Sequence, residues 1–187
     1  MSTPSLFAPS VSRANAVLML HPGAPLTIGE IRRLSGEAHY AATQSALQTL
    51  VRRGVAVGSA RAGKLAFAPD RRSPAYPVAY HAALLDLPWV ASLEAAGVRL
   101  SRVRAIYVHG SVARGDAGEQ SDLDVLLIGD PEQAVVARAF AAIGSVTGRT
   151  VDVAVLRSTE VRDRLAASDA ALANILRAGI RVYGEFE

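Results

Sequence analysis

The sequence predicts a mixed α/β (α+β) chain with two domains, and three observations lead to this prediction. Helical periodicity and a hairpin pattern occupy the first 70 residues, three prolines follow between residues 69 and 77, and β-branched apolar runs lie beyond residue 100. With 187 residues, 50% of them hydrophobic, the chain can form two small cores. We therefore expect domains at 1–70 and 100–187, joined over 71–99 by a proline-rich linker and connecting helices.

Charge is divided unevenly along the chain, although the net charge is only +3. Residues 1–80 hold 9 Arg or Lys against 3 Asp or Glu, a balance of +6, whereas residues 81–187 hold 11 against 14, a balance of −3. A basic first half favours contact with a polyanion. The absence of cysteine excludes disulfides and thiolate chemistry and suits a cytoplasmic protein. We expect no signal peptide and no membrane span.

The first domain is expected to begin with two helices. Apolar residues at helical spacing cover about 11–20 and stop at His21-Pro22-Gly23. Thr27, with Glu30 three residues later, forms the capping-box pattern that starts a second helix, which ends near Gly36.

A third helix is expected over about 38–53, ending at Gly54. Its periodicity places four residues at core spacing: Tyr40, Leu47, Leu50 and Val51. Four polar residues are left on the outward face: Gln44, Ser45, Gln48 and Arg52.

A hairpin with a basic tip is expected next. Apolar triplets at 55–57 and 65–67 flank a connection over 58–64 that contains Arg61 and Lys64. Three helices followed by a basic hairpin resemble a winged helix-turn-helix domain over about 11–69. The resemblance implies that the third helix reads base edges of duplex DNA with Gln and Ser, that Arg61 and Lys64 lie against phosphate or the minor groove, and that the protein binds as a homodimer. The alternative is a winged helix that contacts only proteins.

Residues 76–96 are expected to be helical, with a break at Leu87 because Pro88 suits a new first turn. This segment carries an apolar stripe that indicates packing rather than a cofactor site: His81, Leu84, Leu85, Trp89 and Leu93.

The region 103–128 contains the first chemical motif. Residues two apart in a strand share a face, so Asp122 and Asp124 present two carboxylates side by side. Adjacent carboxylates repel each other unless a cation lies between them, and Mg²⁺ is usually held by one or two carboxylates plus substrate phosphates. The alternative is a polar strand start exposed to water.

Two further features favour a functional site. Ten residues separate Gly110-Ser111 from Asp122; glycine allows close approach of a ligand, and a serine that starts a helical turn suits an anion. A later β-branched run, 150–155, places Asp152 among apolar neighbours. A strand that reads as buried should not carry an unpartnered carboxylate, so Asp152 is predicted to be functional.

Gly110-Ser111, the ten-residue spacing, Asp122-x-Asp124 and the later Asp152 resemble the minimal nucleotidyltransferases of the DNA polymerase beta superfamily, over about 100–183. The resemblance implies that Gly110 and Ser111 hold a nucleoside triphosphate. It also implies that Asp122 and Asp124 bind Mg²⁺, and that Asp152 completes the metal site and helps to deprotonate the attacking hydroxyl. Arg114 either contacts the triphosphate or forms a salt bridge with Asp116 or Glu119. His109 is interpreted as a strand-end residue without a role.

Two functions follow from these patterns. The first is an enzyme that transfers a nucleoside monophosphate, expected to be AMP from ATP, to a hydroxyl acceptor. Proteins of this kind often act as antitoxins that modify a partner toxin, so a protein acceptor such as a cognate toxin is expected. The second is a DNA-binding transcriptional regulator whose nucleotidyltransferase fold senses nucleotide without turnover. The complete set of carboxylates favours the first function, and the winged helix favours the second.

Overall fold

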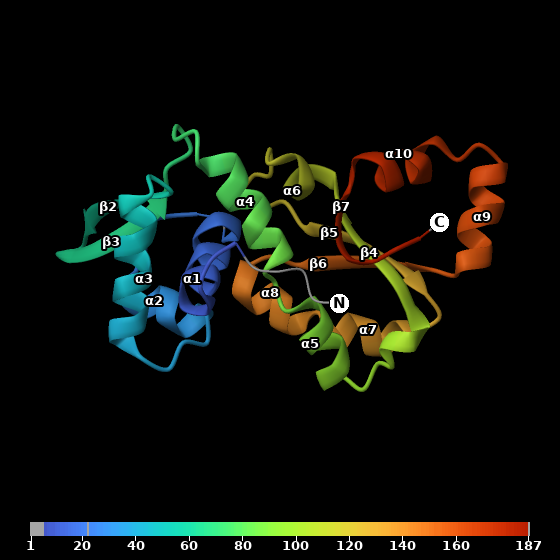
Figure 1. The fold of residues 1–187 in the computed structure, drawn as a ribbon, viewed down its shortest axis with the longest axis horizontal. Coiled ribbons are helices and arrows are strands. Elements are labelled where there is room, and N and C mark those ends of the chain that lie inside the picture. Colours follow the sequence, from blue (N-terminus) through green and yellow to red (C-terminus); the bar gives the residue numbers. More distant parts are fainter. Residues whose placement is uncertain (1–5, 22, 187) are drawn as a thin grey trace. The chain divides into compact units, whose positions relative to one another are not determined.

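Figure 1 shows a mixed α and β chain with two sheets. The computed structural model describes residues 6–21 and 23–186. The internal contacts divide the chain into unit 1, residues 1–87 with 145–148, and unit 2, residues 88–144 with 149–187. The domain limits predicted from the sequence stay a prediction. Within the expected connection 71–99, however, the structure assigns one helix to each unit.

Helix α1 (Pro9–Leu20) contributes much of the buried surface of unit 1. It starts with proline in its first turn, where the missing N–H costs nothing. The buried Asn15 donates from Nδ2 to the carbonyl of Ala79 at 2.8 Å, which ties α1 to α4 (Tyr76–Leu85). The predicted end of this helix at His21 is confirmed, and Pro22 lies outside the described residues.

The predicted capping box is confirmed at the start of α2 (Ile28–Leu34). The N–H of Glu30 donates to the Thr27 hydroxyl at 3.3 Å, and the N–H of Thr27 donates to the Glu30 carboxylate at 2.7 Å. Two backbone donors that the helix leaves free are thereby satisfied.

Helix α3 (Tyr40–Arg52) buries one stripe and exposes another. Leu47 and Leu50 are buried as predicted, but Tyr40 and Val51 are 53% and 40% exposed, so their expected place in the core was wrong. The inner stripe is completed instead by Thr43 and Ala46, which share a helix face with Leu47 and Leu50.

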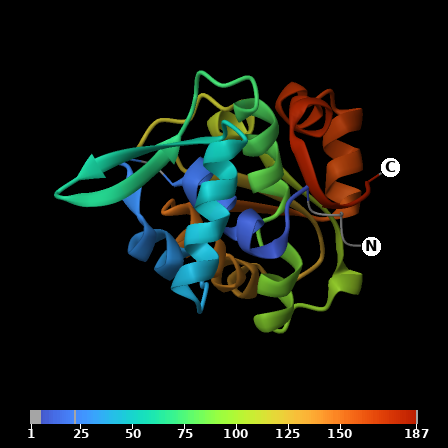
Figure 2. The same ribbon diagram turned by 60° about the vertical axis from the view of Figure 1, so that its left-hand side comes forward.

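The small sheet of unit 1 has the order β1-β3-β2 and is antiparallel. Its strands are β1 (Leu26–Thr27), β2 (Ala56–Arg61) and β3 (Lys64–Pro69), and the β2–β3 hairpin extends as a narrow ribbon in Figure 2. The expected seven-residue connection was wrong, because pairing continues to Arg61 and Lys64. Ala62 and Gly63 alone form the turn, both with positive φ, as in a type I′ turn.

The predicted helix break near Leu87 is confirmed. Pro88 is the cap of α5 (Trp89–Ala95), whose Trp89 packs edge-to-face against Phe140 with ring centroids 5.7 Å apart. Leu84, Trp89 and Leu93 are buried as expected, but His81 is exposed. The inner face of α4 is taken by Ala79, Tyr80 and Ala83 together with Leu84, so the interpretation of His81 as a packing residue was wrong.

Unit 2 contains a four-stranded mixed sheet of order β6-β5-β4-β7. The strands are β4 (Val103–His109), β5 (Leu123–Gly129), β6 (Val151–Leu156) and β7 (Ile180–Gly184). Strands β5 and β6 are parallel, and β4 is antiparallel to both β5 and β7. Besides α5, the helical elements that follow along the chain are η1 (Leu100–Arg102), α6 (Gly110–Arg114), α7 (Gln133–Ala139), α8 (Ala141–Thr147), α9 (Ser158–Ala166) and α10 (Ala170–Ala178), and the last residues of α8 group with unit 1.

Each face of this sheet has its own apolar packing. Tyr107 and Leu126 lie on one face and cluster with Val161 of α9 and Leu172 of α10. On the other side, α7 contacts β6 and α5 contacts β7. The sheet is therefore covered by different helix pairs on its two faces (Figure 1).

Within residues 6–21 and 23–186, none of the helices has the length and apolar character needed to cross a membrane.

Candidate active site

At the junction between β4 and α6, the backbone lies very close to one of the predicted metal ligands. Gly110 follows His109 directly and has a φ of +69°, a conformation that L side chains rarely adopt. A Cβ at this position would lie 2.0 Å from Oδ2 of Asp124. The sequence predicted that this glycine allows close approach, and the group that approaches in the structure is the carboxylate of Asp124.

Three polar residues occupy paired positions on neighbouring strands. His109 of β4 is paired with Asp124 of β5, and Asp124 is paired with Asp152 of β6. Paired residues project from the same face of a sheet, so these three side chains form one row across three strands. Alternation along β4 and β5 places the row on the face that also carries Tyr107 and Leu126.

Asp152 is exposed, which corrects the expectation of a carboxylate within a buried strand. Strand β6 is at the end of the strand order and, within the part of the chain that the structure describes, pairs with β5 alone. Its residues therefore alternate between partly buried and exposed rather than being buried on both faces. The carboxylate of Asp152 faces water on the same row as Asp124, which is half-buried.

His109 joins this row, although sequence reasoning gave it no role. Burial lowers the pKa of its imidazole, while the charges of Asp124 and Asp152 act in the opposite direction. Because the effect of burial is the larger one, the neutral imidazole is favoured at neutral pH. The sequence signal that could have drawn attention to His109 is its position directly before Gly110-Ser111. Its pairing with Asp124 is known only from the structure.

The other predicted site residues lie close to this row along the chain. Asp122 is exposed and lies one residue before β5, and Ser111 is half-buried in the first turn of α6. Nε of Arg114 is 3.1 Å from Oδ2 of Asp116, with both side chains largely exposed. The structure thus contains the salt bridge that was one of the two alternatives for Arg114. A contact between Arg114 and phosphate stays a prediction.

The two carboxylates of the row, together with Asp122, have the donor chemistry that suits a hard cation. Asp122, Asp124 and Asp152 offer carboxylate oxygens, the ligands that Mg²⁺ prefers. Among the described residues, no group of three or more His, Asp or Glu side chains is arranged to hold a metal ion by itself. Mg²⁺ is usually held by one or two carboxylates together with substrate phosphates, and the paired Asp124 and Asp152 fit that arrangement.

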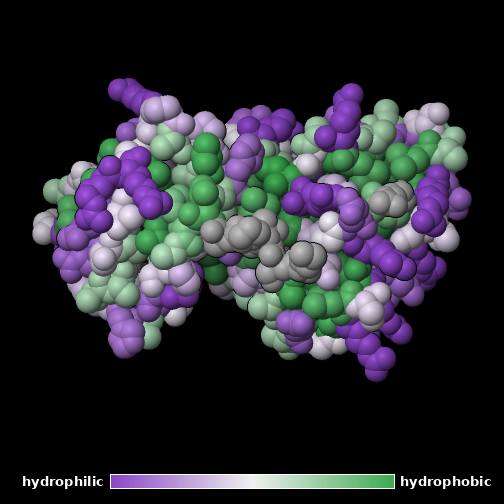
Figure 3. All heavy atoms as spheres, viewed as in Figure 1, coloured by the Kyte–Doolittle hydropathy of each residue, from purple (hydrophilic) through white to green (hydrophobic). Residues whose placement is uncertain are grey.

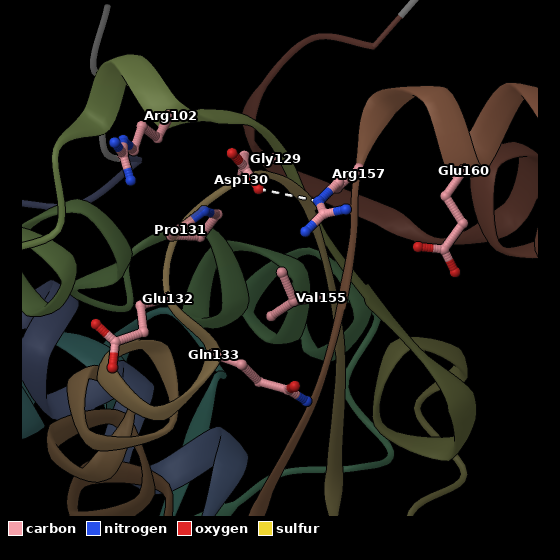
Figure 4. A pocket seen from close by; sticks show the side chains of 9 residues that line it. All are labelled: Arg102, Gly129, Asp130, Pro131, Glu132, Gln133, Val155, Arg157 and Glu160. Carbon is pink, nitrogen blue, oxygen red and sulfur yellow. Dashed lines mark hydrogen bonds and ion pairs between the residues drawn. The ribbon is translucent and has the colours of Figure 1, made fainter.

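A cavity of about 530 Å³ lies at the opposite end of the same sheet, at the carboxyl ends of β5 and β6 (Figure 4). An ion pair between Arg157 and Asp130, 3.1 Å apart and largely exposed, lies at this cavity. None of the three predicted catalytic aspartates lines it, so it is separate from the carboxylate row.

The predicted DNA-binding residues all lie in unit 1. Those of α3 are exposed, and Figure 3 shows hydrophilic side chains on the face near α3 and the β2–β3 hairpin. Lys64 is exposed beside the hairpin turn. Arg61 instead donates to the carbonyl of Pro25 at 2.8 Å and lies 3.3 Å from the carboxylate of Glu30, so it connects the hairpin to the start of α2. The exposed α3 residues among the predicted set are Gln44, Ser45, Gln48 and Arg52.

Comparison with known proteins supports the predicted class of the second domain. Residues 93–175 match the family model described as nucleotidyltransferase domain. This match covers the whole β4–β6 region with its row of polar side chains, and it supports the predicted nucleotidyltransferase domain in this part of the chain. No curated protein and no solved structure matches the chain. A mixed α+β structure with two sheets is consistent with this domain, whose family supports a general function in nucleotidyl transfer.

Proposed function

We propose that this protein is a Mg²⁺-dependent nucleotidyltransferase that transfers AMP from ATP to a hydroxyl group of an acceptor protein, such as a cognate toxin. The observation that carries the proposal is the pairing of Asp124 with Asp152 on adjacent strands. The backbone of Gly110 lies close to the carboxylate of Asp124, and all three residues fall within the segment that matches the nucleotidyltransferase domain. Two carboxylates on one row repel each other, and a cation removes that repulsion.

In this proposal Asp122 and Asp124 hold Mg²⁺ and Asp152 shares in the metal site. When bound, the metal would supply positive charge that offsets the charge of the triphosphate and favours loss of the proton from the attacking hydroxyl. Ser111 donates its hydroxyl to the phosphates. Asp152 accepts the proton of the acceptor hydroxyl as the bond between that oxygen and the α-phosphorus forms. The bond from the α-phosphorus to the β-phosphate oxygen breaks, and pyrophosphate leaves.

The exposure of Asp152 supports a large acceptor. Asp152 and Ala154 are both exposed on β6, the last strand of the sheet order, so the row is open to water on that side. The cavity in Figure 4 lies at the other end of the sheet and does not enclose these carboxylates. A site of this form suits a hydroxyl presented by a protein surface better than a small acceptor that needs to be enclosed.

We also propose that unit 1 is a winged helix-turn-helix domain that binds duplex DNA as a homodimer and takes part in transcription regulation. Three features support this second activity: the order of three helices followed by a hairpin, the exposed polar stripe of α3, and the positive balance of residues 1–80. A regulator that senses nucleotide without turnover remains the alternative to an enzyme, and both activities can coexist in one chain.

The decisive experiment compares wild type with Asp152→Asn in the lysate of the native host, using labelled ATP and Mg²⁺. The substitution keeps the shape of the side chain but removes its charge, so we expect Mg²⁺-ATP binding to persist while transfer falls by several powers of ten, each about 1.4 kcal/mol. Asp163→Asn, an exposed carboxylate on α9, is the matched control and should transfer normally. If wild type labels no acceptor with ATP, GTP, CTP or UTP, the enzyme proposal fails. If Asp152→Asn transfers as well as wild type, Asp152 is structural.

A further inference from the structure

Arg149 connects the two segments that carry the predicted metal ligands. It is half-buried, two residues before β6 and three before Asp152. Its Nη1 donates to the carbonyl of Gly118 at 2.9 Å and to the carbonyl of Ser121 at 2.6 Å. Because Ser121 directly precedes Asp122, one guanidinium links the start of the Asp152 strand to the loop that ends at Asp122.

The loop is folded around the same two residues. The N–H of Gly118 donates to the hydroxyl of Ser121 at 3.0 Å, and the N–H of Ser121 donates to the carbonyl of Gly118 at 3.3 Å. On the other side of Asp122, the N–H of Leu123 donates to the carbonyl of Thr150 at 2.8 Å. Arg149 and Thr150 therefore hold the residues immediately before and after Asp122.

These contacts matter because strand pairing alone does not fix Asp122, which is exposed and lies outside β5. Like charges on Asp122, Asp124 and Asp152 favour their separation when no cation is bound. A guanidinium stays charged at every relevant pH, and its planar donors form short, strong hydrogen bonds with fixed geometry. Arg149 thus resists movement of the loop that ends at Asp122 away from the start of the Asp152 strand.

Resting on the proposed function, we propose that Arg149 is a positioning residue that fixes the loop ending at Asp122 to the start of the Asp152 strand, for the uptake of Mg²⁺ with the triphosphate. Groups that orient metal ligands typically contribute about 10–100-fold to metal affinity or activity. Removal of the guanidinium should therefore raise the Mg²⁺ concentration needed for ATP binding by about 10–100-fold.

The test uses the full chain and three variants. Arg149→Met keeps the length of the side chain without its donors, Arg149→Lys keeps charge and donors on a different geometry, and Arg138→Gln removes an exposed arginine of α7 as the control. ATP binding without an acceptor is measured by calorimetry over a series of Mg²⁺ concentrations. Hydrogen exchange of the peptide covering 115–122 is measured in the absence of metal and compared with the peptide covering β4.

We expect Arg149→Met to need more Mg²⁺ than wild type, Arg149→Lys to lie between them, and Arg138→Gln to match wild type. Exchange in 115–122 should be faster in Arg149→Met, with β4 unchanged. If Arg149→Met unfolds, the inference is tested with Arg149→Lys by the same two measurements, the Mg²⁺ dependence of ATP binding and the hydrogen exchange of 115–122. Equal Mg²⁺ dependence in wild type and the Arg149 variants overturns the inference while leaving the proposed function intact. ATP binding that is independent of Mg²⁺ in wild type overturns both.

Discussion

Gly110 has two requirements at one position: a left-handed backbone and the absence of a Cβ. Gly110→Ala places a methyl group where Oδ2 of Asp124 lies and adds a backbone strain of about 1–3 kcal/mol. We expect a loss of unfolding free energy of at least that size, measured with denaturant, together with loss of Mg²⁺-ATP binding in calorimetry.

Gly97 provides the control for this substitution. Its φ of +83° is equally unfavourable for alanine, but a Cβ there meets no atom within 4 Å. Gly97→Ala should therefore lower stability and still bind Mg²⁺-ATP. Equal nucleotide binding by the two alanine variants would contradict the role given to the close contact between Gly110 and Asp124.

Glu37 makes the stability of unit 1 depend on pH in the acid range. Its carboxylate is paired with the guanidinium of Arg13, accepts from Ser10 at 3.0 Å, and accepts from the N–H of His39. These contacts lower the pKa of Glu37 from 4.5 to about 2, and the hydrogen bond with Arg13 has the largest effect. Because the folded pKa is the lower one, the stabilisation is fully present above the unfolded value and is lost as the pH falls towards 2.

The matching experiment compares thermal melting of wild type and Glu37→Gln over that pH range. The wild type should melt at a higher temperature above about pH 5, and the difference should shrink steadily towards pH 2 as Glu37 takes up its proton. Glu94→Gln, an exposed residue of α5, is the control and should follow wild type throughout. A difference between wild type and Glu37→Gln that does not change with pH would contradict the assignment.

For single residues, the sequence allowed a correct prediction where a short local spacing is enough to define the interaction. The capping box of Thr27 and Glu30 needs only a spacing of three residues, and it is present as expected. His109 and Arg149 were missed because their roles depend on neighbours in space: the register with Asp124 and the loop at 118–121. Neither relation is encoded in a local spacing.

The β2–β3 hairpin presents its two predicted DNA-binding cations differently. Lys64 is exposed beside the turn, whereas Arg61 is held by Pro25 and Glu30. Lys64→Ala should weaken binding to duplex DNA of every sequence and reduce the slope of log affinity against log salt by about one. Arg61→Ala should also weaken binding, and in addition it should lower the melting temperature because it frees the hairpin from α2.

Binding is measured by anisotropy with genomic fragments over a range of salt concentrations. Arg138→Ala, an exposed arginine of α7, serves as the control and should keep the wild-type slope. Binding that is independent of salt, or no binding to any fragment, would contradict the proposed role of unit 1 in DNA recognition.

Among the elements, the least predictable features are those that depend on pairing. The chain was expected to leave seven residues between the hairpin strands, but residue composition does not show that Gly58 to Arg61 continue the ladder up to a type I′ turn. The strand carrying Asp152 was read as buried because its residues are β-branched, yet it has a neighbour on one side only. Strand order is a property of the whole sheet and decides burial more than strand composition does.

At the scale of the whole molecule, the two proposed activities reside in different units. The predicted DNA-binding residues lie in unit 1, and all three predicted catalytic aspartates lie in unit 2. The division between the units falls between residues 87 and 88, whereas the three prolines at 69–77 lie within unit 1. That residues 145–148 group with unit 1 had no signal in the sequence, since the grouping follows from long-range contacts.

This separation predicts that the carboxylates can be removed without loss of DNA binding. In the full chain, Asp122→Asn with Asp124→Asn should abolish Mg²⁺-ATP binding and transfer. Sites that share no partners are additive within about 0.3–0.5 kcal/mol, so DNA affinity should stay within about twofold of wild type. The control pair Glu160→Gln with Asp163→Asn on α9 removes the same charge and accounts for any general gain in affinity from a more positive chain.

DNA affinity of wild type and both double variants is measured with and without Mg²⁺-ATP. If the two activities are independent, Mg²⁺-ATP changes none of the three affinities. If Mg²⁺-ATP shifts the DNA affinity of wild type but not that of the Asp122 and Asp124 variant, the sites are coupled, and DNA must shift nucleotide affinity by the same factor because linkage is reciprocal. That outcome would favour the regulator over the independent enzyme. A large loss of DNA binding in the aspartate variant alone would show that the carboxylates support DNA recognition directly, which would contradict the separation of the two functions.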